Sequence, residues 1–285
     1  MEILIVKSGG FCFGVKRAVD KALEISQRYN NQKIYTIGHI IHNNDIVKKL
    51  KEKNIEPVDI KDINRIKDSV VILRSHGVEK HIIETLTENN NIIIDAICPF
   101  VKKIHNIVKK LVKEKYFIII VGDNNHPEVK AIYSFTEPKS SLIISSPKSK
   151  ELKEFLKMNK KKIGVVAQTT QDYKNFSSIC NKLLKLKSEI RIFNTICDAT
   201  SKRQKETLNV AKKVDIMIVI GGKHSANTTR LKELSLKHLD DVFHIENKNE
   251  LQKEWFKNKK IAGITAGAST PQFVIDDVVQ AIKMF

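Results

Sequence analysis

Residues 116–128 read YFIIIVGDNNHPE, and this stretch decides the fold class. The run 116–121 has the length and apolarity of a buried strand, and Gly122 ends it. The loop that follows carries His126 and Glu128. In open α/β sheets, ligands bind just beyond the carboxyl ends of the strands. We therefore predict an α/β fold whose chemistry lies in the loops that follow strands.

The same pattern recurs in two other parts of the chain. Strand-like runs at 33–37 and 215–220 also end in a glycine and a polar loop. Further strand-like runs precede Cys12, Cys98 and Cys197. Each cysteine is followed by a predicted helix, at 15–25, 101–113 and 201–213. From each cysteine to the glycine of its unit the offsets are 26, 24 and 24 residues. Matched spacing of this kind indicates an internal threefold repeat.

The repeat predicts three related α/β units with mostly parallel sheets. A third strand-like run in each unit ends in small polar residues, and the repeat aligns Ser75, Thr169 and Ser269 at these ends. If the units pack around a pseudo-threefold axis, the loops after their strands converge on one centre. The predicted units cover residues 1–96, 97–193 and 194–285.

Three of the four cysteines lie between a strand end and a helix start, namely Cys12, Cys98 and Cys197. That position favours the thiolate form, which ligates metals. Three converging thiolates suit a soft metal. The spacing leaves two possibilities open: a catalytic zinc with one open position, or an iron–sulfur cluster with one iron that lacks a protein thiolate. Cys180 lies in the apolar stretch 176–184, and we expect it to pack in a core.

The convergent loops also carry hydrogen-bond donors. Clustered imidazole, hydroxyl and amide groups suit a phosphate-type anion. Glu128 beside such a site can deliver a proton, and Thr169 and Thr170 can relay it or hold a substrate hydroxyl. The candidate anion-binding residues are His42, His76, His126, Ser225, Asn227 and Ser269.

The formal charge of +18 is carried mostly by lysine, because only seven of the 50 basic residues are arginine. Lysine-rich connectors are usually solvated loops, so we attribute much of this charge to the general composition of the chain rather than to a binding site. The chain has no RNP-like motif or helix-turn-helix signature, and we expect no nucleic-acid partner. No apolar run approaches the roughly 18–20 residues of a membrane span, and no signal peptide is recognisable. We expect a cytoplasmic protein whose positive field attracts an anionic substrate or an acidic redox partner.

Several of these motifs together resemble the 4-hydroxy-3-methylbut-2-enyl diphosphate reductase family, and the match runs in order along essentially the whole chain. The N-terminal motif Gly10-Phe11-Cys12-Phe13-Gly14-Val15 resembles the family's opening motif. The others are His42-Asn43, Ser75-His76-Gly77-Val78, Asp95-Ala96-Ile97-Cys98-Pro99, His126-Pro127-Glu128-Val129, Gln168-Thr169-Thr170, Cys197-Asp198-Ala199-Thr200 and Thr265-Ala266-Gly267-Ala268-Ser269.

The resemblance implies a reductase that removes the C4 hydroxyl of (E)-4-hydroxy-3-methylbut-2-enyl diphosphate, giving isopentenyl and dimethylallyl diphosphate. It implies three domains around one [4Fe–4S] cluster held by Cys12, Cys98 and Cys197. It further implies that Thr169 orients the hydroxyl and that Glu128 donates the proton. The electron donor it implies is acidic, such as a ferredoxin or a flavodoxin. The residues it implies for the diphosphate are His42, His76, His126, Ser225, Asn227 and Ser269.

One position departs from the family pattern. The family usually has a second serine after Ser225, whereas this chain has Ala226. One side-chain donor to the diphosphate is therefore missing, and we expect somewhat weaker diphosphate binding. Thr228 or a water molecule could compensate.

Overall fold

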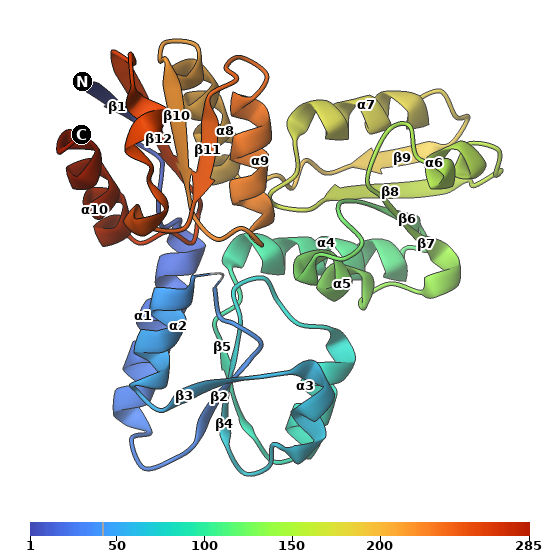
Figure 1. The fold of residues 1–285 in the computed structure, drawn as a ribbon. Helices are drawn as coiled ribbons and strands as arrows, with labels where there is room; N and C mark the ends of the chain where they lie inside the picture. The colour runs from blue at the N-terminus through green and yellow to red at the C-terminus, as the bar shows by residue number, and fades with distance from the viewer. Residues whose placement is uncertain (42) are drawn as a thin grey trace. The chain divides into compact units, whose positions relative to one another are not determined.

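The computed structural model describes residues 1–41 and 43–285, and its strands form three separate four-stranded sheets (Figure 1). The first sheet contains, in spatial order, β3 (Ile55–Val58), β2 (Ile34–Ile37), β4 (Val70–Leu73) and β5 (Ile92–Asp95). The second contains β7 (Ser141–Ile144), β6 (Phe117–Val121), β8 (Lys162–Ala167) and β9 (Glu189–Ile192). The third contains β11 (Val242–Ile245), β10 (Ile216–Ile220), β12 (Ile261–Ala266) and β1 (Glu2–Ile5). All strand pairs in the described residues are parallel, which confirms the predicted fold class.

The three sheets share one strand order, as the repeat predicts. In each sheet the last strand, β5, β9 or β1, lies at an edge and leads to a cysteine. The third sheet takes this edge strand from the N-terminus, with Glu2 opposite Ile261. The predicted first unit, 1–96, includes β1, which the structure pairs within the third sheet. The division into 1–96, 97–193 and 194–285 stays a prediction.

One backbone hydrogen bond repeats at the point where the chain leaves each sheet. In every case a glycine after an inner strand donates its N–H to the last residue of the neighbouring edge strand. This shared contact supports the repeat beyond strand order alone. The three bonds, from N–H to carbonyl oxygen, are Gly38 to Val58 (2.8 Å), Gly122 to Ile144 (3.1 Å) and Gly221 to Ile245 (2.9 Å).

Three helices start at or directly after a cysteine, and their bounds are α1 (Phe13–Arg28), α4 (Pro99–Lys113) and α8 (Asp198–Ala211). The remaining α-helices are α2 (Asn44–Lys51), α3 (Lys80–Glu88), α5 (Pro127–Tyr133), α6 (Lys150–Phe155), α7 (Tyr173–Leu183), α9 (Ala226–Ser235) and α10 (Gln272–Lys283). Short 3-10 turns cover Ile60–Arg65, Pro138–Ser140, Lys248–Glu250 and Lys253–Phe256. Across the described ranges, none of the helices is both long enough and apolar enough for a membrane span.

The second sheet illustrates how the cores form. Alternate residues of β6 point to opposite faces, so Ile118 and Ile120 pack against α4 and α5, whereas Ile119 packs against α6 and α7. All three are fully buried, and each stabilises the fold by roughly 1.5–3 kcal/mol. A Cβ at Gly164 of β8 would lie 2.7 Å from the Leu111 Cδ1 atom of α4. The glycine therefore lets α4 approach the sheet closely, which fixes the helix that begins at a cysteine.

The chain divides into two compact units. One comprises Met1–Lys16, Ile41–Lys49 and Asp198–Phe285, and it contains the third sheet. The other comprises Arg17–Ile40 and Leu50–Cys197, and it contains the first and second sheets. Below, the first is called the third-sheet unit and the second the two-sheet unit.

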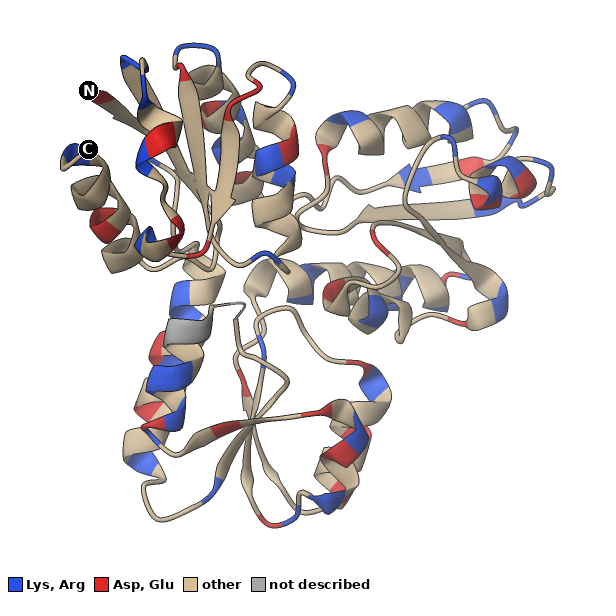
Figure 2. Cartoon of the chain, in the orientation of Figure 1, with Lys and Arg blue, Asp and Glu red and all other residues tan. Residues whose placement is uncertain are grey.

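Basic residues are distributed along the helices and loops of both units. Figure 2 shows that acidic residues are interspersed among them along the chain. Several basic groups pair locally, for example Lys80 with Glu84 one turn later on α3 and Lys150 with Glu154 on α6. This mixture is typical of solvated helix faces.

Candidate functional site

The three predicted ligand cysteines occupy equivalent backbone positions. Each is half-buried, stands at a helix start and donates its N–H to the second residue beyond an inner strand. The bonds are Cys12 to Ala268 (3.1 Å), Cys98 to Ser75 (3.0 Å) and Cys197 to Thr169 (2.9 Å), in each case from N–H to carbonyl oxygen. Two of these three acceptors, Ser75 and Thr169, are the residues that the sequence repeat aligned. In the third unit the equivalent is Ala268 rather than Ser269, one residue earlier than that alignment.

The thiol of Cys12 accepts a hydrogen bond from the Val15 backbone N–H at 3.5 Å, as a thiolate at a helix N-terminus does. None of the four cysteines, all in the described part of the chain, forms a disulfide. Among residues 1–41 and 43–285, no three His, Cys, Asp or Glu side chains are grouped closely enough to hold a metal ion. Cys12 lies in the third-sheet unit, and Cys98 and Cys197 lie in the two-sheet unit.

Cys180 differs from the other three in its surroundings. It is 6% exposed and lies within the apolar cluster of α6, α7 and the second sheet. Burial raises the pKa of its thiol to about 11. A thiol that stays protonated is a poor metal ligand, and the prediction that Cys180 packs in a core is confirmed.

Glu128 and Thr169 form the most distinctive contact in the two-sheet unit. Glu128 is 1% exposed and belongs to the first turn of α5. Its Oε1 accepts the Thr169 backbone N–H at 2.6 Å, and its Oε2 accepts the Thr169 hydroxyl at 2.6 Å. Burial raises the pKa of Glu128 to about 7, although both bonds from Thr169 act to lower it. A buried carboxyl group that titrates near neutral pH suits general acid catalysis.

Two of the predicted histidines lie together beside this pair. The ring centroids of His76 and His126 are 5.7 Å apart in an edge-to-face arrangement. The Nδ1 atom of His126 accepts the Glu128 backbone N–H at 3.1 Å, so the proton of the neutral ring is on Nε2. His126 therefore caps α5 through Nδ1.

Polar groups at the start of α9 make up the predicted anion site of the third-sheet unit. Ser225 caps α9, and its Oγ accepts the Thr228 backbone N–H at 3.4 Å. Asn227 is 5% exposed, and neither its Oδ1 nor its Nδ2 has a hydrogen-bond partner among the described residues. Leaving a buried polar group without a partner costs about 1–3 kcal/mol. The amide of Asn227, with the N–H groups of a helix N-terminus, is therefore suited to an anionic ligand. Ser269, 7% exposed, lies beyond the end of β12 in the same unit.

Thr228 does not take the role of the missing serine at Ala226. Its side chain is fully buried, and its hydroxyl packs against two glycines at strand ends. A Cβ at Gly221 would lie 2.8 Å from the Thr228 Oγ1, and a Cβ at Gly267 would lie 2.1 Å from it. The hydroxyl thus points toward the end of the sheet, while Ala226 remains half-buried at the first position of α9.

The structure also identifies polar residues that the site prediction missed. Asn43 precedes α2, and its Oδ1 accepts the Ile46 backbone N–H at 3.0 Å, so it caps its helix as His126 and Ser225 cap theirs. Gln168 is buried, accepts the Asp123 backbone N–H at 3.1 Å through Oε1 and so braces the loop that leads to His126. The motifs around His42 and Thr169 contained both residues, but their types alone did not reveal a bracing role. The predicted site residue His42 lies outside the described residues.

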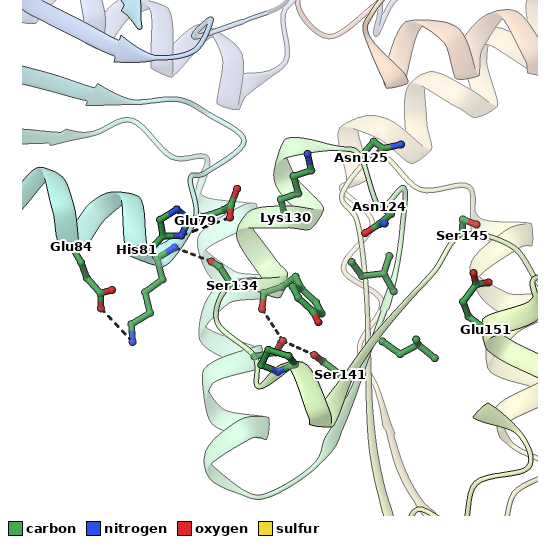
Figure 3. A pocket seen from close by; sticks show the side chains of 16 residues that line it. Glu79, His81, Glu84, Asn124, Asn125, Lys130, Ser134, Ser141, Ser145 and Glu151 are labelled. Carbon is green, nitrogen blue, oxygen red and sulfur yellow. Dashed lines mark hydrogen bonds and ion pairs between the residues drawn. The ribbon is translucent and has the colours of Figure 1, made fainter. Parts of the chain in front are cut away.

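A groove of about 870 Å³ also lies in the two-sheet unit, beside α3 and α5 (Figure 3). Its lining includes Glu79, Lys80 and Lys130, and the Lys80 backbone N–H donates to the Ser134 hydroxyl at 2.8 Å. None of the predicted site residues in the described ranges lines it. Because its acidic and basic groups are mixed, it lacks the one-signed charge of an anion site.

Known proteins are similar to this chain over nearly its whole length. Residues 3–283 match the model of the LytB protein family. The 4-hydroxy-3-methylbut-2-enyl diphosphate reductase of Caldanaerobacter subterraneus subsp. tengcongensis is 43% identical over 284 residues, covering 99% of this chain and 97% of the relative. The enzyme of that name from Campylobacter hominis is 44% identical over 284 residues, covering 99% of both chains.

Two solved structures share the fold over nearly the whole chain. The structure of (E)-4-hydroxy-3-methyl-but-2-enyl diphosphate reductase, the terminal enzyme of the non-mevalonate pathway, aligns with a TM-score of 0.70 and 39% identity and covers 100% of both chains. The structure of the E-1-hydroxy-2-methyl-but-2-enyl-4-diphosphate reductase from Plasmodium falciparum aligns with a TM-score of 0.87 and 29% identity, covering 98% of this chain and 87% of that one. The family match, the identity to these relatives and the shared fold confirm the resemblance seen in the sequence: the chain belongs to the LytB protein family.

Proposed function

We propose that this protein is a 4-hydroxy-3-methylbut-2-enyl diphosphate reductase. The reaction breaks the bond between C4 and its hydroxyl oxygen, which leaves as water after it takes up a proton. The allyl fragment takes up two electrons and a second proton at either end, giving isopentenyl or dimethylallyl diphosphate. Membership of the LytB family supports this assignment, as do the names of the relatives.

The buried pair of Glu128 and Thr169 is the observation that carries the proposal. With a pKa raised to about 7, Glu128 is a mixture of carboxylic acid and carboxylate at neutral pH. In its acid form it can protonate a departing hydroxyl and be reloaded afterwards. The bonds from Thr169 to both carboxyl oxygens fix the group's orientation. Thr169 is also in place to orient the substrate hydroxyl toward that acid.

The diphosphate is bound by imidazole, amide and hydroxyl donors. His76 and His126 supply imidazole N–H groups, and their rings lie 5.7 Å apart. Asn227, whose buried amide has no hydrogen-bond partner among the described residues, supplies a donor at the N-terminus of α9. Phosphate groups are favoured at such helix ends because N–H groups and the helix dipole point at the anion. Two further hydroxyls and one imidazole complete the proposed set, from Ser225, Ser269 and His42.

The cofactor is one [4Fe–4S] cluster held by Cys12, Cys98 and Cys197. The three thiols fit such a group in their chemistry, because each is half-buried, free of a disulfide and held by the same backbone contact at a helix start. When bound, the cluster supplies the electrons and an iron that lacks a protein thiolate and can accept a substrate oxygen. The electron donor is an acidic protein such as a ferredoxin or a flavodoxin, which the +18 charge attracts, and the enzyme acts in the cytoplasm.

Anaerobic reconstitution followed by turnover tests the proposal. We expect about one cluster per chain by iron and sulfide analysis, and reduction of the diphosphate substrate by a chemical reductant. Glu128→Gln should keep the cluster and lower kcat by about 100- to 10,000-fold, the usual contribution of a general acid. Glu84→Gln, at a half-exposed carboxylate on α3, is the matched control and should turn over at the wild-type rate.

Two results would count against the assignment. A colourless protein that binds zinc and reduces no diphosphate would instead support a hydrolase on the same three thiols. Wild-type turnover by Glu128→Gln would remove the proton-donor role while leaving the cluster assignment intact.

A further inference from the structure

Arginine is scarce in this chain, and its placement is selective. Only seven of the 50 basic residues are arginine, so the composition strongly favours lysine wherever a positive charge is enough. Yet three of the seven, Arg17, Arg74 and Arg203, donate to backbone carbonyls in turns beside predicted site residues. Arginine differs from lysine in offering a rigid fork of donors rather than a single point charge.

Arg203 makes the most complete of these contacts. It lies on α8, is 2% exposed and donates through Nε to the Ser8 carbonyl at 2.8 Å and through Nη2 to the Gly10 carbonyl at 2.9 Å. One turn later on α8, Glu206 accepts the Ser8 backbone N–H at 2.8 Å. Two side chains of α8 thus bind two carbonyl groups and one N–H group of the turn that leads to Cys12.

That turn is constrained from the sheet side as well. The Gly10 N–H donates to the Ala266 carbonyl at 3.3 Å, and Gly10 has φ +88°, a conformation that favours glycine. The Cys12 N–H donates to the Ala268 carbonyl at 3.1 Å. The backbone before Cys12 is therefore fixed between the end of β12 and the guanidinium of Arg203, which leaves the thiol little positional freedom.

A similar contact precedes Cys98. Arg17 on α1 donates through Nη1 to the Ile97 carbonyl at 3.1 Å, and Lys21, one turn later, donates to the Asp95 carbonyl at 3.1 Å. The two cations hold consecutive parts of the segment that leads from β5 to the cysteine. Two of the three predicted ligand cysteines are therefore preceded by a turn that a helical arginine binds.

We propose that Arg203 and Arg17 are positioning residues that hold the backbone of the Cys12 and Cys98 turns in the geometry needed to retain the cluster. The inference rests on the proposed function, because it takes these cysteines as cluster ligands. Groups that orient metal ligands typically contribute 10- to 100-fold to metal affinity. Lysine cannot replace Arg203 fully, since one ammonium group does not match two carbonyls as a planar fork does.

Arg203→Met, Arg203→Lys and Arg17→Met test the inference, with Arg65→Met as the control because the Arg65 side chain is 85% exposed. Backbone hydrogen exchange of the metal-free protein comes first. We expect exchange of the Gly10 and Cys12 amides to rise about tenfold or more in Arg203→Met, to rise less in Arg203→Lys and to stay unchanged in the control. In Arg17→Met the faster exchange should move to the Cys98 amide, which keeps the test decisive if Arg203→Met does not fold.

Reconstituted proteins provide the second measurement. Resistance of the iron to a chelator should fall about 10- to 100-fold in Arg203→Met, and Arg203→Lys should recover part of it. Wild-type exchange at Gly10 and Cys12 together with wild-type chelator resistance in Arg203→Met would overturn the inference. Failure of the proposed function has a different signature, because the wild-type protein itself would then bind no iron and sulfide.

Discussion

Glu128→Gln should remove a pH-dependent penalty on stability. The pKa of Glu128 is raised from 4.5 to about 7 by burial, so between these values the folded chain binds a proton that the unfolded chain releases. Stability contributed by this neutral carboxyl is present at low pH and is lost as the pH rises through about 7. Glutamine stays neutral at every pH and keeps the shape of the protonated acid.

The size of the effect follows from the shift. The pKa of Glu128 is shifted from 4.5 to about 7 on folding. As the pH rises from about 5 to about 8, this shift lowers the free energy of unfolding of the wild type by about 2.5 kcal/mol relative to Glu128→Gln. The geometry allows the variant to be well folded, because its amide oxygen can accept the Thr169 N–H and its amide group can donate to the Thr169 hydroxyl. The stability of the variant relative to the wild type should therefore increase as the pH rises from about 4.5 to about 7 and should level off above that.

Two assays check this prediction. Urea unfolding of the metal-free proteins, followed by circular dichroism at several pH values, gives the difference in free energy of unfolding. Carbon NMR of glutamate labelled at the carboxyl group follows the titration directly, and the Glu128 signal is identified by its loss in the variant. Parallel pH dependences of the two proteins, or a Glu128 signal that titrates at its ordinary value, would refute the reasoning.

Substitutions at four other positions test further roles. Thr169→Val removes a hydrogen bond that lowers the pKa of Glu128. The alkaline limb of the pH–rate profile should therefore move to higher pH in Thr169→Val and should stay in place in Thr169→Ser. Asn227→Leu should raise the free energy of unfolding in urea by about 1–2 kcal/mol and should abolish stabilisation by inorganic pyrophosphate. A variant less stable than the wild type would show that the Asn227 side chain has a structural partner. Ala226→Ser should tighten pyrophosphate binding about fivefold by calorimetry, the value of one added hydrogen bond of about 1 kcal/mol. Cys180→Ser should keep the wild-type iron content. Its free energy of unfolding should fall by about 1–2 kcal/mol, because the substitution places a hydroxyl in an apolar cluster. Loss of iron would instead identify Cys180 as a ligand.

Local patterns predicted most elements of the fold. The predicted strand 116–121 begins one residue before β6 and ends with it. The predicted helix 101–113 begins two residues after the start of α4 and ends with it. These elements follow from apolar periodicity and from Pro99 at the first helical position, both of which are encoded within a few residues. The three-unit repeat was recognisable because its spacing survives where residue identity does not.

Long-range pairings could not be predicted in the same way. Nothing in Glu2–Ile5 indicates that its partner is β12, because strand partners are chosen by packing across the whole chain. Likewise, the raised pKa of Glu128 depends on its burial beside Thr169, 41 positions away in sequence. The family motifs named both residues, but only the fold gives the two 2.6 Å hydrogen bonds that join them.

The pairing of β1 with β12 has a consequence for how the protein is made. A ribosome releases β1 before the other eleven described strands and β12 last of them, so β1 waits for its partner while the strands between them are made. Until then its edge is open to wrong partners, and unpaired strand edges are prone to aggregation. The turn around Cys12 can reach its final geometry only after β12 and α8 have emerged. The first two sheets can be complete by then, so insertion of the proposed cluster should be a late event.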